Sequence, residues 1–237
     1  MKKENQLLNC FIDILKDEPR GKVLDIGCGS GDYSLSLKNL GFGVLAADMD
    51  VERFCYREEI PFQQCNVSQK LPFSDALFDY IILAEVVEHL YNPLDVMKEL
   101  NRVLKNGGKI VLSTPNILNL KSRMRFLIEG CWDYFREPPL DHIKNPKTGW
   151  NLHVIPWRYH ELEYLLYCAG FNIELLKTSK LNSKGLMFLL PLIRLQCYLK
   201  AKRSSKKGGL DYNRINNVIL SKEILFGEHL VIKAVKN

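Results

Sequence analysis

The chain has 237 residues, of which 46% are hydrophobic and 25% are charged, enough to bury the core of one α/β domain with insertions. Lys and Arg outnumber Asp and Glu by 33 to 27, but seven of the basic residues and no acidic residue lie between Leu181 and Gly209. The rest of the chain is nearly neutral, which excludes a broad nucleic-acid-binding surface and leaves one segment suited to contact anions.

The first predicted element is a helix over residues 5–17, whose apolar side chains recur at helical spacing. Acidic residues inside this stretch, and the lack of a small-residue cleavage site after it, distinguish it from a secretory leader. Seven cysteines, none of them in a C-x-x-C pair, predict free thiols rather than disulfides or a zinc site. We therefore expect a cytoplasmic protein without a metal site.

The next elements alternate between strand and helix. Residues 22–26 (KVLDI) form a short apolar strand that runs into a glycine-rich turn. A helix follows over residues 33–40, ended by Gly41, and residues 43–47 form a second strand. Residues 78–84 (FDYIILA) are apolar apart from Asp79, which is typical of a parallel strand buried on both faces.

The helix after this strand has marked ends. Asn92 is expected as its N-cap and Pro93 as its first residue, and Asn106-Gly107-Gly108 is expected to end it. The remaining predicted elements are a strand over residues 109–113 closed by Pro115, a helix over 159–168 followed by Gly170, and strands over 171–178 and 229–235. The pattern predicts an α/β fold with one doubly wound, mostly parallel sheet, in a single domain over residues 1–237.

Two long segments, residues 116–156 and 181–226, interrupt this alternation. Such segments in a compact domain are commonly lids or binding elements, and residues 116–156 are predicted to form a lid over the substrate. The alternative is that the aromatic residues of this segment form a satellite core under a long loop. In the second segment, residues 185–207 join a 15-residue apolar stretch to a basic end. The stretch is shorter than the ~20 residues that span a bilayer. It either lies in the interface of an anionic membrane, as a peripheral attachment to the inner membrane face, or forms a helix pair that caps the sheet.

The sequence VLDIGCGSG, over residues 23–31, carries the main functional signal. Gly27, Gly29 and Gly31 permit backbone angles closed to other residues and let a ligand approach the main chain. The third glycine of the NAD fingerprint G-x-G-x-x-G is missing, and Asp25 would repel a pyrophosphate. Asp25 instead suits a cationic amino-acid group. The alternative is a strand–helix turn that binds no ligand.

A second acidic residue, Asp48, ends the second predicted strand, 21 residues after Gly27. In a doubly wound sheet this carboxylate lies at the carboxyl end of the neighbouring strand, where it can accept hydrogen bonds from two ribose hydroxyls. The two acidic positions together favour a positively charged nucleoside over a dinucleotide.

These segments, with LPFSDALFDYIILAEVVEHL and NPLDVMKELNRVLKNGGKIVLSTPN further along, resemble class I S-adenosylmethionine-dependent methyltransferases. The resemblance is close over residues 22–116 and looser through HVIPWRYHELEYLLYCAGF, and it includes the ubiquinone-type O-methyltransferases. It implies a Rossmann-like sheet of seven strands with the last strand antiparallel. It also implies S-adenosylmethionine as the cofactor and S-adenosylhomocysteine as the product.

The resemblance further implies a set of cofactor-binding residues. They are Asp25, Gly27, Cys28, Gly29 and Gly31 for the methionine part, Asp48 for the ribose, Met49, Asn66 and Val67 for the adenine, and Ala84 and Glu85 beside the methyl donor. Asn66 and Val67 stand where the family often has an aspartate near the adenine amine, and the amide oxygen of Asn66 can accept the same hydrogen bond.

The resemblance also places two histidines on the substrate side. His89, in EVVEHL, is a candidate base for an acceptor hydroxyl, since imidazole titrates near neutral pH; the alternative is a helix-start residue bonded to a backbone carbonyl. His153 matches a histidine of methyltransferases from bacterial sugar and polysaccharide gene clusters, as a second candidate base or a substrate contact. Glu88 is expected to be structural or to orient His89.

The predicted reaction is methyl transfer to a hydroxyl oxygen of a small-molecule, sugar or lipid-linked acceptor. N-methylation is the alternative, but the Asn/Asp-Pro-Pro-Tyr/Phe run that N-methyltransferases of the family often carry is replaced by Ala84-Glu85-Val86-Val87. A nicotinamide-dependent oxidoreductase and a non-catalytic cofactor-binding protein on the same fold are the other candidates. No nucleic-acid partner is expected, and the sequence does not determine the oligomeric state.

Overall fold

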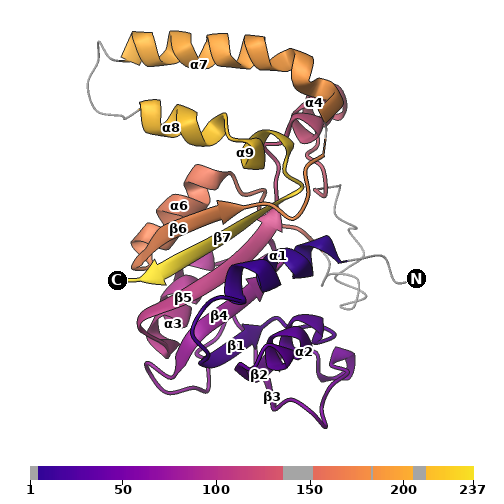
Figure 1. Cartoon of the computed structure of the whole chain (residues 1–237), viewed down its shortest axis with the longest axis vertical. Coiled ribbons are helices and arrows are strands. Elements are labelled where there is room, and N and C mark those ends of the chain that lie inside the picture. Colours follow the sequence, from indigo (N-terminus) through magenta and orange to yellow (C-terminus); the bar gives the residue numbers. More distant parts are fainter. Residues whose placement is uncertain (1–4, 136–151, 183, 205–211) are drawn as a thin grey trace.

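The computed structural model describes residues 5–135, 152–182, 184–204 and 212–237. At its centre is a seven-stranded sheet in the order β3-β2-β1-β4-β5-β7-β6 (Figure 1). The strands are β1 (Lys22–Ile26), β2 (Gly43–Asp48), β3 (Phe62–Gln64), β4 (Phe78–Ala84), β5 (Leu104–Pro115), β6 (Phe171–Lys177) and β7 (His229–Lys236). Only β7 runs antiparallel to its neighbours, β5 and β6. This confirms the predicted fold, including the antiparallel last strand.

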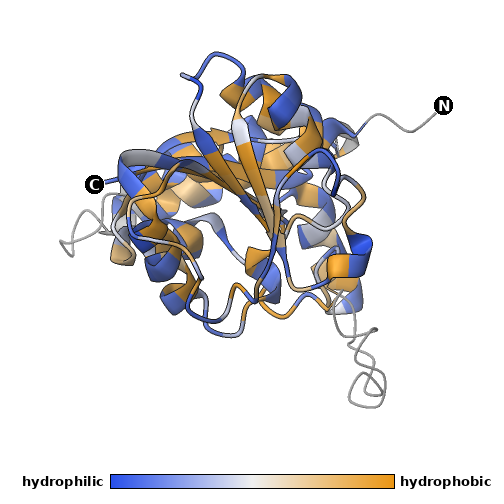
Figure 2. Ribbon diagram, turned by 90° about the horizontal axis from the view of Figure 1, so that it is seen from below, coloured by the Kyte–Doolittle hydropathy of each residue, from blue (hydrophilic) through white to orange (hydrophobic). Residues whose placement is uncertain are grey.

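Helices cover both faces of the sheet, with hydrophobic strands between them (Figure 2). One face packs on α3 (Pro93–Val103) and α6 (Tyr159–Cys168), and the other packs on α1 (Gln6–Leu15) and α2 (Asp32–Asn39). In β4, Ile81 contributes to the first cluster and Ile82 to the second, and both are fully buried. This two-sided burial explains why the strand is apolar apart from Asp79, which is only partly buried and pairs with Lys105.

Most predicted elements are confirmed within a few residues, and two details differ. The helix α3 ends at Val103, and Asn106-Gly107-Gly108 belongs to β5, because Leu104 already pairs with Phe78 of β4. Asn92 occupies the N-cap of α3, but its amide donates a hydrogen bond to the Asp95 carboxylate and its side chain does not cap the backbone.

The short strand β3 has no predicted counterpart, because three residues at the sheet edge are too few to show a period.

The segment between β6 and β7 is mostly helical where the structure describes it, after Leu181, which pairs with Gly227 in an isolated bridge. It comprises a 3-10 helix over Lys184–Leu189, then α7 (Leu190–Ser204), α8 (Tyr212–Ile219) and α9 (Lys222–Phe226). Figure 1 shows α7 and α8 as a pair at one end of the molecule. Residues 183 and 205–211 of the predicted insertion lie outside the described residues. Among the helices that are described, none is long and apolar enough to cross a bilayer.

Candidate active site

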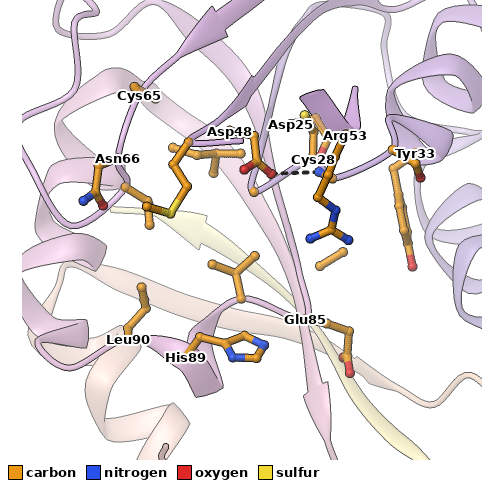
Figure 3. A pocket seen from close by; sticks show the side chains of 18 of the residues that line it. Asp25, Cys28, Tyr33, Asp48, Arg53, Cys65, Asn66, Glu85, His89 and Leu90 are labelled. Atoms are coloured by element: carbon orange, nitrogen blue, oxygen red, sulfur yellow. Dashed lines mark hydrogen bonds between the residues drawn. The ribbon is translucent and has the colours of Figure 1, made fainter. Parts of the chain in front are cut away.

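A cavity of about 550 Å³ opens at the carboxyl ends of β1, β2 and β4 (Figure 3). The loops after these strands and after β3 form its wall. The strands β2 and β4 lie on opposite sides of β1, so the direction of the strand order reverses there. Open α/β sheets bind their ligands at such a point. The volume lies within the range of small-molecule sites.

The glycine turn after β1 brings main chain to the cavity. Gly27 has a φ of +73°, and a Cβ atom built on it would lie 2.5 Å from Cγ2 of Val86. The Gly27 and Cys28 N–H groups both donate to the carbonyl of Ala47, at 2.8 and 3.2 Å, which ties the turn to β2. Gly31 does not line the cavity; its φ of +88° begins α2, where a Cβ would strike the Phe54 ring.

Two carboxylates flank this turn. Asp25 is buried and accepts a hydrogen bond of 2.5 Å from the Ser34 hydroxyl, and its burial raises its pKa to about 6. Asp48 accepts the Gly29 N–H at 2.8 Å through Oδ2 and the Asp50 N–H at 2.9 Å through Oδ1. Each Asp48 oxygen keeps a lone pair for a further donor.

The charged residues that the structure describes in the cavity wall are mainly acidic. They are Asp25, Asp32, Asp48 and Glu85, with Arg53 as the basic residue. Figure 3 shows the Arg53 and Tyr33 side chains on the side of the cavity that holds Asp25 and Cys28. This excess of carboxylates favours a ligand with a positive charge.

The opposite end of the cavity is more apolar. Met49, Asn66 and Val67, the residues predicted to contact the adenine, line it together with Cys65 and Leu90. The Asn66 side-chain oxygen accepts the Ser68 N–H at 2.9 Å, so its second lone pair remains for a ligand amine.

Glu85 follows β4 in a strained conformation. Its φ is +55°, a region that non-glycine residues rarely adopt. One carboxylate oxygen accepts a 2.7 Å hydrogen bond from the Ser113 hydroxyl, and the other lies 3.7 Å from Nε2 of His229. Burial raises the Glu85 pKa to about 7. His229 was not predicted as a site residue, because it joins Glu85 only when β7 is placed beside β5.

His89 and His153 meet at the edge of the cavity, with ring centres 4.8 Å apart. The Nδ1–H of His89 donates to the Leu152 carbonyl at 2.8 Å, which leaves Nε2 unprotonated on the neutral ring. Burial lowers the pKa of both histidines. Among the described residues, Nδ1 of His153 has no hydrogen-bond partner. The alternative role predicted for His89 was a hydrogen bond to a backbone carbonyl. That bond is present, and it fixes the tautomer of the ring.

Glu88 completes a cluster that the sequence patterns did not predict. Its carboxyl group is fully buried, burial raises its pKa well above the ordinary value, and neither oxygen has a hydrogen-bond partner among the described residues. Ligand atoms of Glu88, His89 and His153 lie within 4.8 Å of one another, and such side chains can hold a divalent metal ion. The sequence showed no such site because His153 is distant from EVVEH.

The predicted lid, residues 116–156, is described only in part, since residues 136–151 lie outside the described residues. Its first part contains α4 (Leu120–Glu129), and the Phe135 ring lies 5.2 Å from the His153 ring. The Tyr134 hydroxyl donates to the Glu228 carboxylate at 2.5 Å. The described part thus reaches the histidines, and its role as a lid stays a prediction.

Comparison with known proteins gives consistent matches. Residues 5–174 match a family model described as a methyltransferase domain. Ubiquinone biosynthesis O-methyltransferases of Nitrosococcus oceani and Histophilus somni are each 31% identical, over 132 and 134 residues. Each match covers 48% of this chain and 56% of the relative, so the chain spans about half the length of these curated relatives.

Solved structures agree in fold. A SAM-dependent methyltransferase from Archaeoglobus fulgidus superposes with a TM-score of 0.62 at 20% identity, covering 99% of this chain and 96% of the other. A SAM-dependent methyltransferase from Methanosarcina mazei gives a TM-score of 0.57 at 22% identity, covering 95% and 96%.

Proposed function

Because this chain belongs to the class I S-adenosylmethionine (SAM)-dependent methyltransferases, we propose that it methylates a hydroxyl oxygen of a small organic acceptor. The observation that carries this proposal is the unprotonated Nε2 of His89 at the edge of the cavity, on a ring whose other nitrogen is held by the Leu152 carbonyl. A base in this position can take the proton that a hydroxyl must lose during methylation. Sugar and lipid-linked hydroxyls both belong to this class.

The cavity fits the cofactor. We propose that the turn at Gly27, Cys28 and Gly29, together with Asp25, holds the methionine end. The glycines leave the main chain of the turn accessible to a ligand, and ionised Asp25 supplies a negative charge for the amino group. Asp48 would accept the ribose hydroxyls through its two remaining lone pairs. Met49, Asn66 and Val67 would then contact the adenine, with Ala84 and Glu85 beside the sulfonium. When bound, the cofactor supplies an activated methyl group on a positively charged sulfur.

The protein residues act by positioning and by moving one proton. Burial keeps His89 neutral at physiological pH, so it accepts a proton from the acceptor hydroxyl rather than donating one. His153, which lines the cavity beside His89, is proposed as a second acceptor contact. Glu85 would balance the positive charge in the ground state, while alignment of the reacting atoms supplies much of the rate.

The experiment that tests this function is a transfer assay with isotopically labelled SAM. A panel of phenols, sugars and lipid-linked alcohols is compared with amines of similar shape, and products are identified by mass. We expect label in an oxygen ether and none in an amine. Label only in an amine would contradict hydroxyl methylation, and cofactor binding without any transfer would favour the non-catalytic alternative.

The affinity for SAM should depend on pH. The Asp25 and Glu85 pKa values are raised to about 6 and about 7, so both carboxyls are protonated in acid and ionise as the pH rises through that interval. The ammonium group of the methionine end favours ionised Asp25 and the sulfonium favours ionised Glu85, so the SAM affinity should rise by up to about tenfold per pH unit for each proton released. Calorimetry at several pH values tests this, with S-adenosylhomocysteine as control. S-adenosylhomocysteine keeps the ammonium group but lacks the sulfonium charge, so it should keep the pH dependence near 6 from Asp25 and lose the dependence near 7 from Glu85. Equal pH dependence for both ligands would contradict the assignment of Glu85 to the sulfonium.

Gly27→Ala should weaken SAM binding by about tenfold to 100-fold, because the added Cβ forces Val86 to move in the cavity wall. Gly107→Ala is the matched control, since Gly107 has a φ of +72° but a Cβ atom built on it would meet no described atom within 4 Å. Both variants should lose about 1–2 kcal/mol of stability from backbone strain, measured by thermal unfolding. If Gly107→Ala weakens binding as much as Gly27→Ala, strain rather than the cavity contact is responsible.

A further inference from the structure

An apolar surface lies at the end of the molecule formed by α7. Its exposed side chains are Met187, Phe188, Leu192, Leu195, Tyr198 and Leu199, with Leu127 and Ile128 at the end of α4. We call these residues the α7 surface. Phe188 is 72% exposed, and Leu127 and Ile128 are 77% and 76% exposed. A group of large apolar side chains this open to solvent is typical of an interaction site.

The α7 and α4 parts of this surface are neighbours. Figure 1 shows α4 beside the start of α7, at the end of the molecule opposite β3. The helix α4 also packs on α9, which contacts α8, the helix that packs on α7. Apolar side chains of two elements therefore gather at one end of the protein.

The helix α7 also differs from the core helices in its pattern. Apolar residues occupy two faces of it: Ile193 and Cys197 are partly buried on the side that packs on α8, whereas Leu192, Leu195 and Tyr198 are exposed on another side. A helix that is apolar on several sides normally has partners on those sides. Within the described chain, α8 covers one side and leaves these side chains open.

The positive charge of this segment indicates an anionic partner. Seven Lys and Arg residues and no acidic residue lie between Leu181 and Gly209, and the rest of the chain is nearly neutral. Arg194 and Lys200 are exposed on α7 itself. A two-fold contact between two copies of this surface would bring these cations together, which costs energy. An anionic surface would instead neutralise them.

We propose that the α7 surface docks on the face of a lipid bilayer that carries anionic headgroups. Its apolar side chains enter the boundary between headgroups and acyl chains, while Arg194 and Lys200 remain at the level of the headgroup phosphates. The 15 residues of α7 are too few to cross the bilayer, so the helix lies along the interface. This docking is independent of the transfer reaction, and it keeps the cavity free to bind SAM while the protein is attached.

The test is cosedimentation of the full chain with vesicles of phosphatidylcholine, either pure or mixed with phosphatidylglycerol. We expect pelleting with the mixed vesicles at low salt, little with pure phosphatidylcholine, and release as salt increases. Phe188→Ser/Leu192→Ser should weaken partitioning on the order of 100-fold. Arg194→Gln/Lys200→Gln should weaken it roughly 30-fold, since each basic residue near an anionic surface contributes about fivefold.

Matched controls lie elsewhere on the protein. Tyr167→Ser removes an exposed aromatic of α6, and Lys98→Gln removes an exposed cation of α3; both should pellet like the unaltered chain. SAM binding by every variant, measured in parallel, confirms folding and separates this test from that of the proposed function. Absence of pelleting, or equal pelleting of all variants, would overturn the proposal. So would sedimentation velocity showing a dimer that Phe188→Ser/Leu192→Ser dissociates, because the surface would then bind a second copy.

Discussion

Replacing His89 with glutamine should lower kcat for methyl transfer to a hydroxyl about 10²- to 10⁴-fold, the usual contribution of a general base. Glutamine is similar in size and polar, but its amide does not accept a proton. The Kd for SAM should stay unchanged, because the loss lies in the chemical step. Steady-state kinetics and calorimetry on the same preparation measure both quantities.

The pH profile provides a second readout of His89. Burial lowers its pKa below the ordinary 6.5, so the neutral base is present at neutral pH and is lost as the pH falls through that lowered value. The rate should fall in the same interval, and this decrease should be absent in His89→Gln.

Two further measurements limit the interpretation of the His89 result. His160→Gln, at a histidine of α6 outside the cavity wall, should keep the kcat of the unaltered enzyme. Loss of activity on chelation, restored by a divalent cation, would contradict the base assignment. It would instead indicate that Glu88, His89 and His153 hold a metal ion.

Asp48→Ala should raise the Kd for SAM on the order of 100-fold or more. Two hydrogen bonds from ribose hydroxyls to a carboxylate are lost, each contributing about 1.5–3 kcal/mol. The Gly29 and Asp50 N–H groups also lose the acceptor that orders the turn. Calorimetric titration with SAM and with S-adenosylhomocysteine should show the same loss, because both ligands carry the ribose.

Asp50→Ala is the control for this effect. Asp50 carries the same charge two residues away, but it is outside the cavity wall and accepts the Glu52 N–H. Its replacement should leave the Kd for SAM nearly unchanged. A similar loss in both variants would mean that general electrostatic attraction, rather than hydrogen bonding by Asp48, accounts for the affinity.

The fold was predictable wherever one local pattern decides the structure. The strands β1 and β4 match their predicted limits because their apolar residues are buried on both faces of the sheet. The helix α6 also matches, since Gly170, with a φ of +86°, marks its end. Where tertiary pairing decides, local signals failed: Gly107 and Gly108 indicate a helix end, but the pairing of Leu104 with Phe78 extends β5 over them.

The same distinction between local and tertiary signals applies to the predicted site residues. The glycine turn, Asp25 and Asp48 occupy short segments at strand ends, and the sheet topology brings them together as expected. The pairing of His229 with Glu85 depends on the position of β7. The cluster at Glu88 depends on where residues 152–156 return to the sheet, with the Val154 and Ile155 N–H groups bound to the Glu88 carbonyl. Such contacts have no local sequence signal.

The central claim is that a glycine-rich turn with an accessible main chain, flanked by Asp25 and Asp48, binds a sulfonium nucleoside. Isothermal titration of the full chain with SAM, S-adenosylhomocysteine and NAD⁺ tests it most directly. We expect saturable binding of the first two, weakened on the order of 100-fold or more in Asp48→Ala, and no binding of NAD⁺. Binding of NAD⁺ in this cavity, or no heat with S-adenosylhomocysteine from folded protein, would contradict it.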